Sequence, residues 1–156
     1  MTKNKKKRYL PFSFRPMFED ANTSARKVFM TCFYNIIDAQ DSCGRTMAMY
    51  GAAFGDIEVL ECCKRHNADF NMQDDIGWTA IISAVVENRE KAVEYLLNNV
   101  KNLDLSKKDE SGKDVFQLAK HSTDKIKAML YSYLYTNVNN PVVKQVKETN
   151  VKTRIN

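Results

Sequence analysis

A short pattern that returns at nearly fixed spacing constrains the fold of this chain more than any other feature of its sequence. It reads Asp-Ser-Cys-Gly-Arg-Thr at residues 41–46 and Asp-Asp-Ile-Gly-Trp-Thr at residues 74–79. A weaker third copy, Asp-Glu-Ser-Gly-Lys-Asp, occupies residues 109–114. The glycine of the second copy follows that of the first by 33 residues, and the third follows by a further 35. A period of this length indicates stacked supersecondary units, because a single unit cannot bury its apolar face alone.

The residues around these copies resemble the repeating unit of the ankyrin family. The first copy matches the family pattern at Asp41, Gly44, Thr46, Ala52, Gly55, Glu58, Val59 and Ala68-Asp69-Phe70-Asn71. The second matches it at Asp74, Gly77, Thr79, Ile81, Ala84, Val93, Leu96 and Leu97, and the third keeps Asp109, Gly112, Phe116 and Ala119. The resemblance covers roughly residues 22–135. It implies an all-α fold, a short solenoid of stacked helix-turn-helix units with hairpin turns at their tips.

Three segments are expected along the chain. Residues 1–20 form a basic N-terminal arm rich in proline and aromatic residues, and residues 137–156 form a flexible tail. Between them lies the repeat domain, residues 21–136, with repeats at about 41–73, 74–108 and 109–136. Apolar spacing at Val28, Cys32, Phe33, Ile36 and Ile37 predicts a helix over 21–38 that covers the open end of the stack. The preceding residues, 9–18, favour an extended segment packed on the repeat domain, with a short docking motif as the alternative.

Within the repeats we expect helices over residues 47–54, 57–65, 90–98, 115–120 and 124–135. Gly44 can take the positive φ that a hairpin-like turn requires. Asp56 suits the start of a helix, and Asn67 suits the left-handed residue that follows one. Gly51 stands where the family usually has alanine, and we expect it to cost about 0.5–1 kcal/mol inside its helix.

The formal charge of +5 is unevenly distributed along the 156 residues. The first eight residues carry +5 and residues 137–156 carry +3, so the body between them carries −3. A mildly acidic body argues against nucleic-acid binding by the repeat surface, since such modules place basic clusters on the folded face. The basic run Lys5, Lys6, Lys7 and Arg8 fits a nuclear import signal that an import receptor would bind. The alternative is a solvated basic tail, or one attracted to anionic membranes or RNA. A reporter fused to residues 1–10 would distinguish these alternatives by its location.

The sequence contains no secretory signal, because Pro11, Arg15 and Pro16 interrupt its first apolar stretch. No run reaches the roughly 20 apolar residues that a membrane-spanning helix needs. We therefore expect a soluble intracellular protein, cytoplasmic or nuclear, whose four cysteines are reduced thiols.

In ankyrin arrays, the turn tips and the concave side of the first helices make most partner contacts. Carried over position by position, the resemblance assigns this role to Ser42, Cys43, Arg45, Phe54, Asp75, Ile76, Trp78, Val86, Glu87 and Lys113. Apolar residues at Phe54, Ile76, Trp78 and Val86 would form the centre of a binding hot spot with a polar rim. The alternative is that Trp78 only packs on the neighbouring turn.

Catalysis, a cofactor and a metal site are not expected. His66 and His121 are the only histidines, and neither a nucleophile elbow nor a phosphate-binding glycine loop is present. Cys62 and Cys63 are adjacent, so on a helix their side chains diverge by about 100°. We expect both to be core residues, whereas Cys43 at a turn tip is a candidate reactive thiol.

Asn71 resembles the asparagine that intracellular hydroxylases modify in ankyrin repeats. The structural alternative is that its side chain closes a turn by hydrogen bonding.

The sequence therefore predicts a non-enzymatic module that binds one protein partner as an adaptor or competitive regulator. Two alternatives remain open. One is a nucleic-acid-associated nuclear factor that uses its basic ends, and the other is an accessory subunit with a permanent interface.

Overall fold

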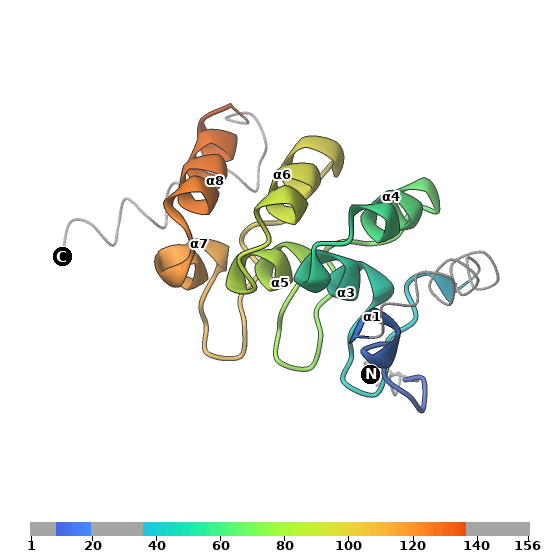
Figure 1. Cartoon of the computed structure of the whole chain (residues 1–156). Coiled ribbons are helices and arrows are strands. Elements are labelled where there is room, and N and C mark those ends of the chain that lie inside the picture. Colours follow the sequence, from blue (N-terminus) through green and yellow to red (C-terminus); the bar gives the residue numbers. More distant parts are fainter. Residues whose placement is uncertain (1–8, 20–35, 137–156) are drawn as a thin grey trace, which may run out of the picture.

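The computed structural model describes residues 9–19 and 36–136 (Figure 1). The basic run at residues 5–8, the tail from residue 137 and nearly all of the helix expected over 21–38 lie outside these residues. Within them the secondary structure is helical and contains no strand, as the sequence predicts. None of the described helices is long and apolar enough to cross a membrane.

The helices form two rows (Figure 1). The first helix of each repeat lies in an inner row and the second in an outer row, while the hairpin turns project from the inner row. The inner helices are α3 (Met47–Phe54), α5 (Ala80–Val86) and α7 (Val115–Leu118), and the outer ones are α4 (Ile57–Arg65), α6 (Glu90–Asn99) and α8 (Asp124–Thr136). The bounds predicted for α3 and α4 are confirmed, and those for α6 and α8 differ by one residue at the C-terminal end. The helix expected over 115–120 is wrong in its second half, since α7 ends at Leu118 and a 3₁₀ turn, η2 (Ala119–His121), follows.

Local capping explains where these helices begin and end. The side chains of Thr46, Thr79 and Asp114 accept a backbone N–H at the start of α3, α5 and α7. Asp56 does the same for α4, as predicted. Left-handed residues follow the helices: Gly55 after α3 and Asn67 after α4, with φ of 73° and 57°. In the first repeat, the inner and outer helices are therefore joined by a turn that the sequence specifies locally.

The apolar core runs continuously between the two rows and from one repeat to the next. Its fully buried large side chains come from every repeat and include Met49, Leu60, Ile81, Ile82, Val85, Val93, Leu96, Leu103, Leu105, Ile126 and Leu130. Cys62 and Cys63 are buried in this core, as predicted, while Cys43 is exposed.

Residues 9–19 form an additional unit at the N-terminal end of the stack. They contain a short helix, α1 (Pro16–Glu19), which lies beside α3 in the inner row (Figure 1). Phe14 and Phe18 are only 2% and 6% exposed, which confirms the packed alternative for this segment. The expectation of a wholly extended segment is wrong, because Pro16 occupies the first helical position, where its fixed φ favours a helix. We call residues 9–19 the strap.

Gly51 in α3 lies close against α4, a packing role that the sequence did not indicate beside the expected cost to its helix. A Cβ at this position would lie 2.8 Å from Cγ1 of Val59 and 3.3 Å from Cδ2 of Leu60. Both neighbours belong to α4 and are buried. The glycine thus lets the inner and outer helices of the first repeat approach closely.

We predict that Gly51→Ala destabilises the protein by up to about 2 kcal/mol. Alanine is favoured over glycine in a helix by about 1 kcal/mol, but overpacking a core costs about 1–3 kcal/mol. Chemical denaturation of a double-mutant cycle with Val59→Ala checks the cause. Gly51→Ala should be neutral or stabilising in the Val59→Ala background, and equal destabilisation in both backgrounds would contradict the contact with Val59.

Candidate functional site

The hairpin tips share one turn geometry built on an aspartate. Oδ1 of Asp41 accepts the backbone N–H groups of Cys43 and Arg45 at 2.9 and 3.0 Å. Asp74 and Asp109 repeat the same pair of bonds to the residues two and four positions further along the chain. The glycine of each turn has a φ between 74° and 83°, which other residues rarely adopt. The aspartate and the glycine of the sequence pattern together define the tip.

Backbone and side-chain hydrogen bonds hold neighbouring tips side by side. The N–H of Asp75 donates to the carbonyl of Cys43 at 3.3 Å, and the N–H of Glu110 donates to the carbonyl of Ile76 at 3.0 Å. Gln73 Nε2 spans two repeats, donating to the carbonyls of Gly77 and Lys108 at 2.8 Å each. The tips therefore form one ordered edge, on which candidate residues from three repeats lie close together.

The strap continues this edge beyond the first repeat. The N–H of Ser42 donates to the carbonyl of Phe12 at 3.3 Å, in the same way that the later tips are joined. The Tyr9 hydroxyl donates to Oδ1 of Asp75 at 2.6 Å, so the strap also reaches the second tip. The sequence alone did not place this segment at the candidate site. The available signal was Phe12 and Pro16, which stand 31 residues before Cys43 and Met47 and so extend the repeat.

Arg45 and Trp78 stabilise each other across two tips. Arg45 Nε lies 3.1 Å from Oδ2 of the buried Asp74. The guanidinium carbon is 5.8 Å from the ring centre of Tyr50 and 5.9 Å from that of Trp78, within the range of cation–π contacts. Trp78 is half-buried and packs on the core. Trp78 therefore packs on the neighbouring turn, and part of its side chain is still accessible to a partner.

The remaining candidate residues differ in exposure. Ser42, Cys43, Asp75, Glu87 and Lys113 are exposed, whereas Ile76 and Val86 are half-buried. Phe54 is 36% exposed, and its ring lies 5.4 Å from that of Phe18 in the strap. The accessible part of the predicted apolar patch is therefore smaller than expected, and one side of Phe54 is covered by the chain itself.

Asp41 is a fully buried carboxylate with several hydrogen-bond donors around it. Besides the two backbone groups, the Tyr50 hydroxyl donates to Oδ2 at 2.9 Å and the Phe14 N–H does so at 3.2 Å. Burial by itself would raise the pKa of this carboxyl group, but hydrogen bonds from the Arg45 and Cys43 N–H groups and from the Tyr50 and Ser13 hydroxyls outweigh it. The net effect lowers the pKa of Asp41 below its ordinary value.

The described residues contain no arrangement typical of a metal centre. No group of three or more His, Cys, Asp or Glu side chains in residues 9–19 and 36–136 is placed to hold a metal ion. His66 and His121 are both exposed. Asn71 spans two repeats, since its Nδ2 donates to the carbonyl of Asn102 at 2.9 Å and its Oδ1 accepts from the N–H of Asp104 at 2.8 Å. This is the structural role that the sequence left as an alternative to modification.

We predict that Asp41→Asn lowers the free energy of unfolding at neutral pH by about 1–2 kcal/mol, because the amide offers one acceptor oxygen in place of two. A carboxyl group whose pKa is lowered by folding stabilises the protein above its unfolded pKa of about 3.9. That contribution is lost as the pH falls through the folded pKa. Urea denaturation between neutral and acid pH should therefore show a smaller acid loss in the variant than in the wild type. Asp124→Asn, at an exposed carboxylate, controls for charge, and equal acid loss in Asp41→Asn and wild type would contradict the role of Asp41.

We predict that iodoacetamide modifies Cys43 in the native protein and spares Cys62 and Cys63. Burial, with smaller contributions from Cys62 and Asp38, raises the pKa of Cys63 to about 12, so almost no thiolate is present at pH 8. Peptide mass mapping would separate the sites, with urea-unfolded protein as the control in which all cysteines react. Rapid native labelling of Cys63 would show that α3 and α4 separate readily.

Comparisons with known proteins agree with this geometry. A family model for ankyrin repeats (3 copies) matches residues 21–109, which is more than half of the chain. A similar protein is the "Ankyrin repeat and SAM domain-containing protein 6" of Rattus norvegicus, 29% identical over 85 residues. The matched stretch is 54% of this chain and 9% of that protein, so the chain spans only a small part of the relative's length. The third repeat lies almost entirely beyond the family match, yet its tip and helix pair repeat the arrangement of the other two. The chain belongs to the ankyrin-repeat family.

Proposed function

We propose that the protein is a non-enzymatic adaptor or competitive regulator that binds one protein partner through its hairpin tips and inner helices. Ankyrin repeats are generally protein-interaction modules, and the single observation that carries the proposal is the ordered edge of tips. Side chains from three repeats are held in register there by backbone hydrogen bonds. A preorganised edge loses little conformational entropy when a partner binds, which favours binding.

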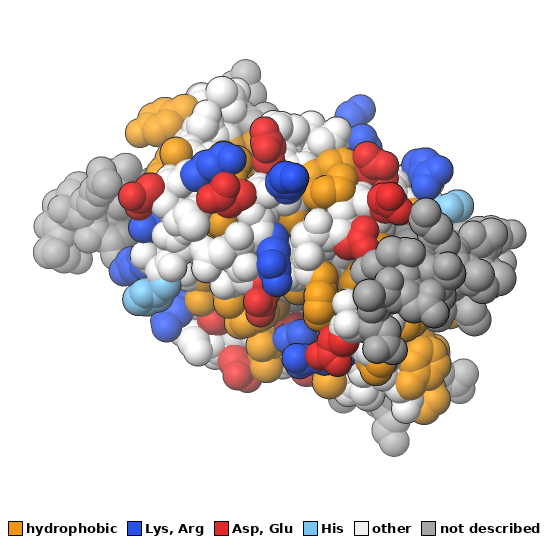
Figure 2. All heavy atoms as spheres, viewed as in Figure 1, with side chains coloured by type: hydrophobic (Ala, Val, Ile, Leu, Met, Phe, Trp, Pro, Cys, Tyr) orange, Lys and Arg blue, Asp and Glu red, His pale blue; other side chains and the backbone are white. Residues whose placement is uncertain are grey.

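The chemistry of the edge suits a protein partner. The three tips carry the exposed polar residues Ser42, Asp75 and Lys113, together with the half-buried Ile76 and Trp78. An apolar centre with a polar rim is the usual anatomy of a protein–protein interface. Figure 2 shows basic and acidic side chains interspersed over the face in view, rather than a continuous basic surface. This favours a protein over a nucleic acid as the partner of the repeat domain.

The basic run at residues 5–8 has a separate place in the proposal. It precedes the strap, whose Tyr9 is hydrogen-bonded to the second tip. We propose that an import receptor binds this run, so that the protein is located in the nucleus as well as the cytoplasm.

We predict that Ile76→Asp with Glu87→Lys weakens the affinity for the partner at least about tenfold without unfolding the protein. A buried aspartate at the interface would have no compensating partner, and reversing Glu87 changes the charge of the rim. The measurement is affinity capture from cell lysate with quantitative mass spectrometry, beside circular dichroism melts of each variant. These substitutions avoid Phe54 and Trp78, which also support the fold through Phe18 and Arg45.

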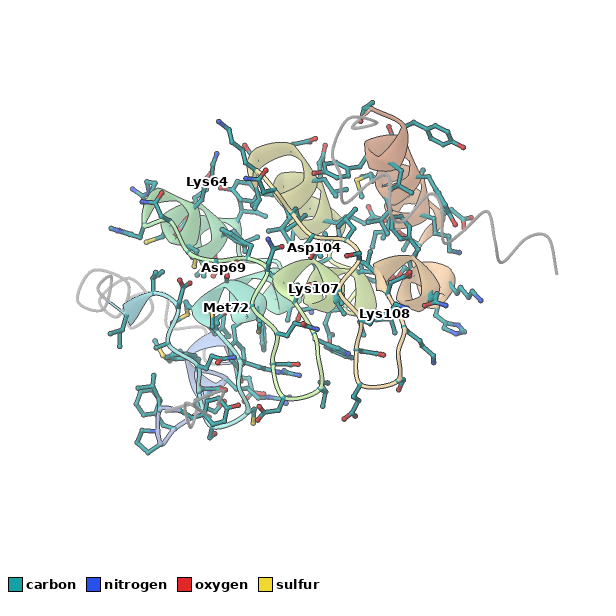
Figure 3. The ribbon with its side chains drawn as sticks, turned by 180° about the vertical axis from the view of Figure 1, so that it is seen from behind. Lys64, Asp69, Met72, Asp104, Lys107 and Lys108 are labelled. Atoms are coloured by element: carbon teal, nitrogen blue, oxygen red, sulfur yellow. The ribbon has the colours of Figure 1, made fainter. Side chains whose placement is uncertain are left out.

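The matched control is Met72→Asp with Glu61→Lys, which makes the same chemical changes away from the tips. Met72 lies on the side of the molecule shown in Figure 3, and Glu61 is exposed on α4. A protein retained by the wild type and the control, and lost from the tip variant, would be the partner. If every captured protein is retained equally by all three, binding by the tip edge is wrong.

A further inference from the structure

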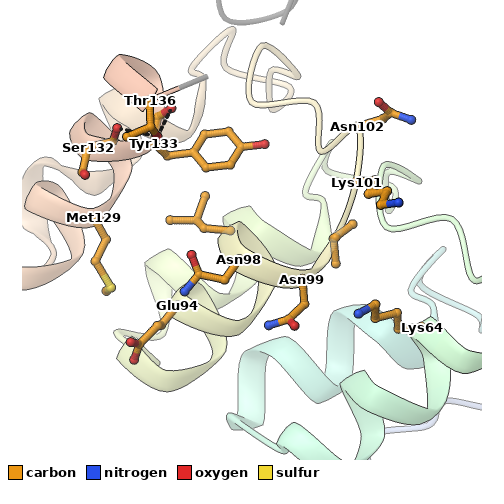
Figure 4. Close-up of a pocket in the computed structure, with 12 residues that line it drawn as sticks. Lys64, Glu94, Asn98, Asn99, Lys101, Asn102, Met129, Ser132, Tyr133 and Thr136 are labelled. Carbon is orange, nitrogen blue, oxygen red and sulfur yellow. Dashed lines mark hydrogen bonds between the residues drawn. The ribbon is translucent and has the colours of Figure 1, made fainter. Parts of the chain in front are cut away.

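A groove of about 840 Å³ lies on the outer row of helices, away from the tips (Figure 4). Its walls come from the C-terminal ends of α4, α6 and α8 and from the loop that follows α6. A space of this size holds a short peptide or a small organic molecule rather than a single ion. Nothing in the proposed tip interface uses it.

The groove arises where the repeat departs from its period. The second and third tips are separated by 35 residues, whereas the first and second are separated by 33. One of the two additional residues lengthens the outer helix, because α6 has ten residues where α4 has nine. The other lies in the connection, where the left-handed Asn102 stands three residues beyond Asn99, while Asn67 stands two beyond Arg65. Asn99, Val100 and Lys101 of this longer stretch all line the groove. In repeat arrays, insertions of this kind often mark a binding face.

The two ends of the groove carry opposite charge. Lys64 and Lys101 lie at one end, and Glu94 lies beside Met129 at the other (Figure 4). Both lysines are exposed, and among the described residues neither has a carboxylate within ion-pair distance. Their positive charge is therefore available to an anionic group of a ligand. Because both lysines lie at one end, this charge would orient the ligand along the groove.

Amide and apolar groups occupy the space between these ends. Asn98 is exposed and has no side-chain hydrogen bond within the described part of the chain, so its carbonyl and NH₂ groups can pair with both polar groups of a peptide bond. Leu97 and Met129 supply apolar surface beside it. A nucleic acid would require a continuous basic track for its phosphates, and Glu94 interrupts such a track here.

We propose that this groove binds an extended peptide segment of a partner protein, with an acidic residue at the lysine end and an apolar residue over Leu97 and Met129. The surface is distinct from the tip edge, so the protein can hold two protein segments at once, which is what an adaptor requires. The chain's own residues 137–156 are the wrong occupant on charge, since they carry four basic side chains against one acidic.

The test is selection of a phage-displayed library of random dodecapeptides on the full-length protein. Enriched peptides are synthesised with a fluorescent label, and their affinities are measured by anisotropy against each variant. We expect enriched sequences to combine an acidic and an apolar residue, and to bind Lys64→Glu with Lys101→Glu at least about tenfold more weakly than wild type. Replacing the acidic residue of the peptide by lysine should restore binding to that double variant. Ser132→Trp, which fills the groove without changing a charge, should also abolish binding.

The matched control is Lys107→Glu with Lys108→Glu, which reverses two lysines on the same side of the molecule outside the groove (Figure 3). This control should bind like wild type, and circular dichroism melts check that each variant is folded. The proposal is wrong if no sequence is enriched, or if enriched peptides bind the Lys64 and Lys101 variant as they bind wild type. It is also wrong if only the Ile76 and Glu87 variant loses them, because the peptides then bind the tip edge. That last result would leave the proposed function intact.

Discussion

The carboxylate at the start of each tip is the interaction on which the repeat depends. In all three tips one oxygen accepts two backbone N–H groups, and these would otherwise be unpaired within a tight turn. Two of these carboxylates are buried, Asp41 at 0% and Asp74 at 5% exposure. A buried charge is costly unless it is paired and hydrogen-bonded. Asp41 meets this condition with backbone and hydroxyl donors, and Asp74 meets it with Arg45. The fixed turn then sets the direction in which each inner helix starts.

Much of the fold could be predicted because its determinants are local. The period of 33 residues placed the tips, the cap expected at Asp56 is confirmed, and the bounds expected for α3 and α4 match the structure to the residue. The end of α7 could not be placed in this way, since it depends on the neighbouring repeat. There the Ser122 hydroxyl donates to the carbonyl of Val85 at 2.8 Å, and the chain tightens into a 3₁₀ turn before it.

The features that the sequence did not reveal depend on contacts between distant residues. Helix propensity depends only on the residue itself and therefore assigns Gly51 a cost. The close contact that Gly51 makes is with α4. The strap looked like an extended arm, but its aromatic rings pack on Tyr50 and Phe54 of α3. The exposed fraction of the candidate site residues depends on contacts of the same kind. The repeat pattern indicates Arg45 and Phe54 by position alone, and each of them contacts a neighbour that no local pattern indicates.

The two ends of the described stack limit their exposed apolar surface in different ways. At the N-terminal end the strap covers Tyr50 of α3 with Phe14 and Phe18. In the third repeat, polar side chains replace apolar ones at positions that are buried in the second repeat. Ile82 and Val85 are buried in α5, whereas the equivalent positions 35 residues later are the exposed Gln117 of α7 and Lys120 of η2. A terminal repeat needs such a polar face, because no further unit covers the positions that are apolar inside the stack. The ends therefore expose less apolar surface than an interior repeat would, which agrees with our proposal that partners bind along the sides, where the tips and the groove lie.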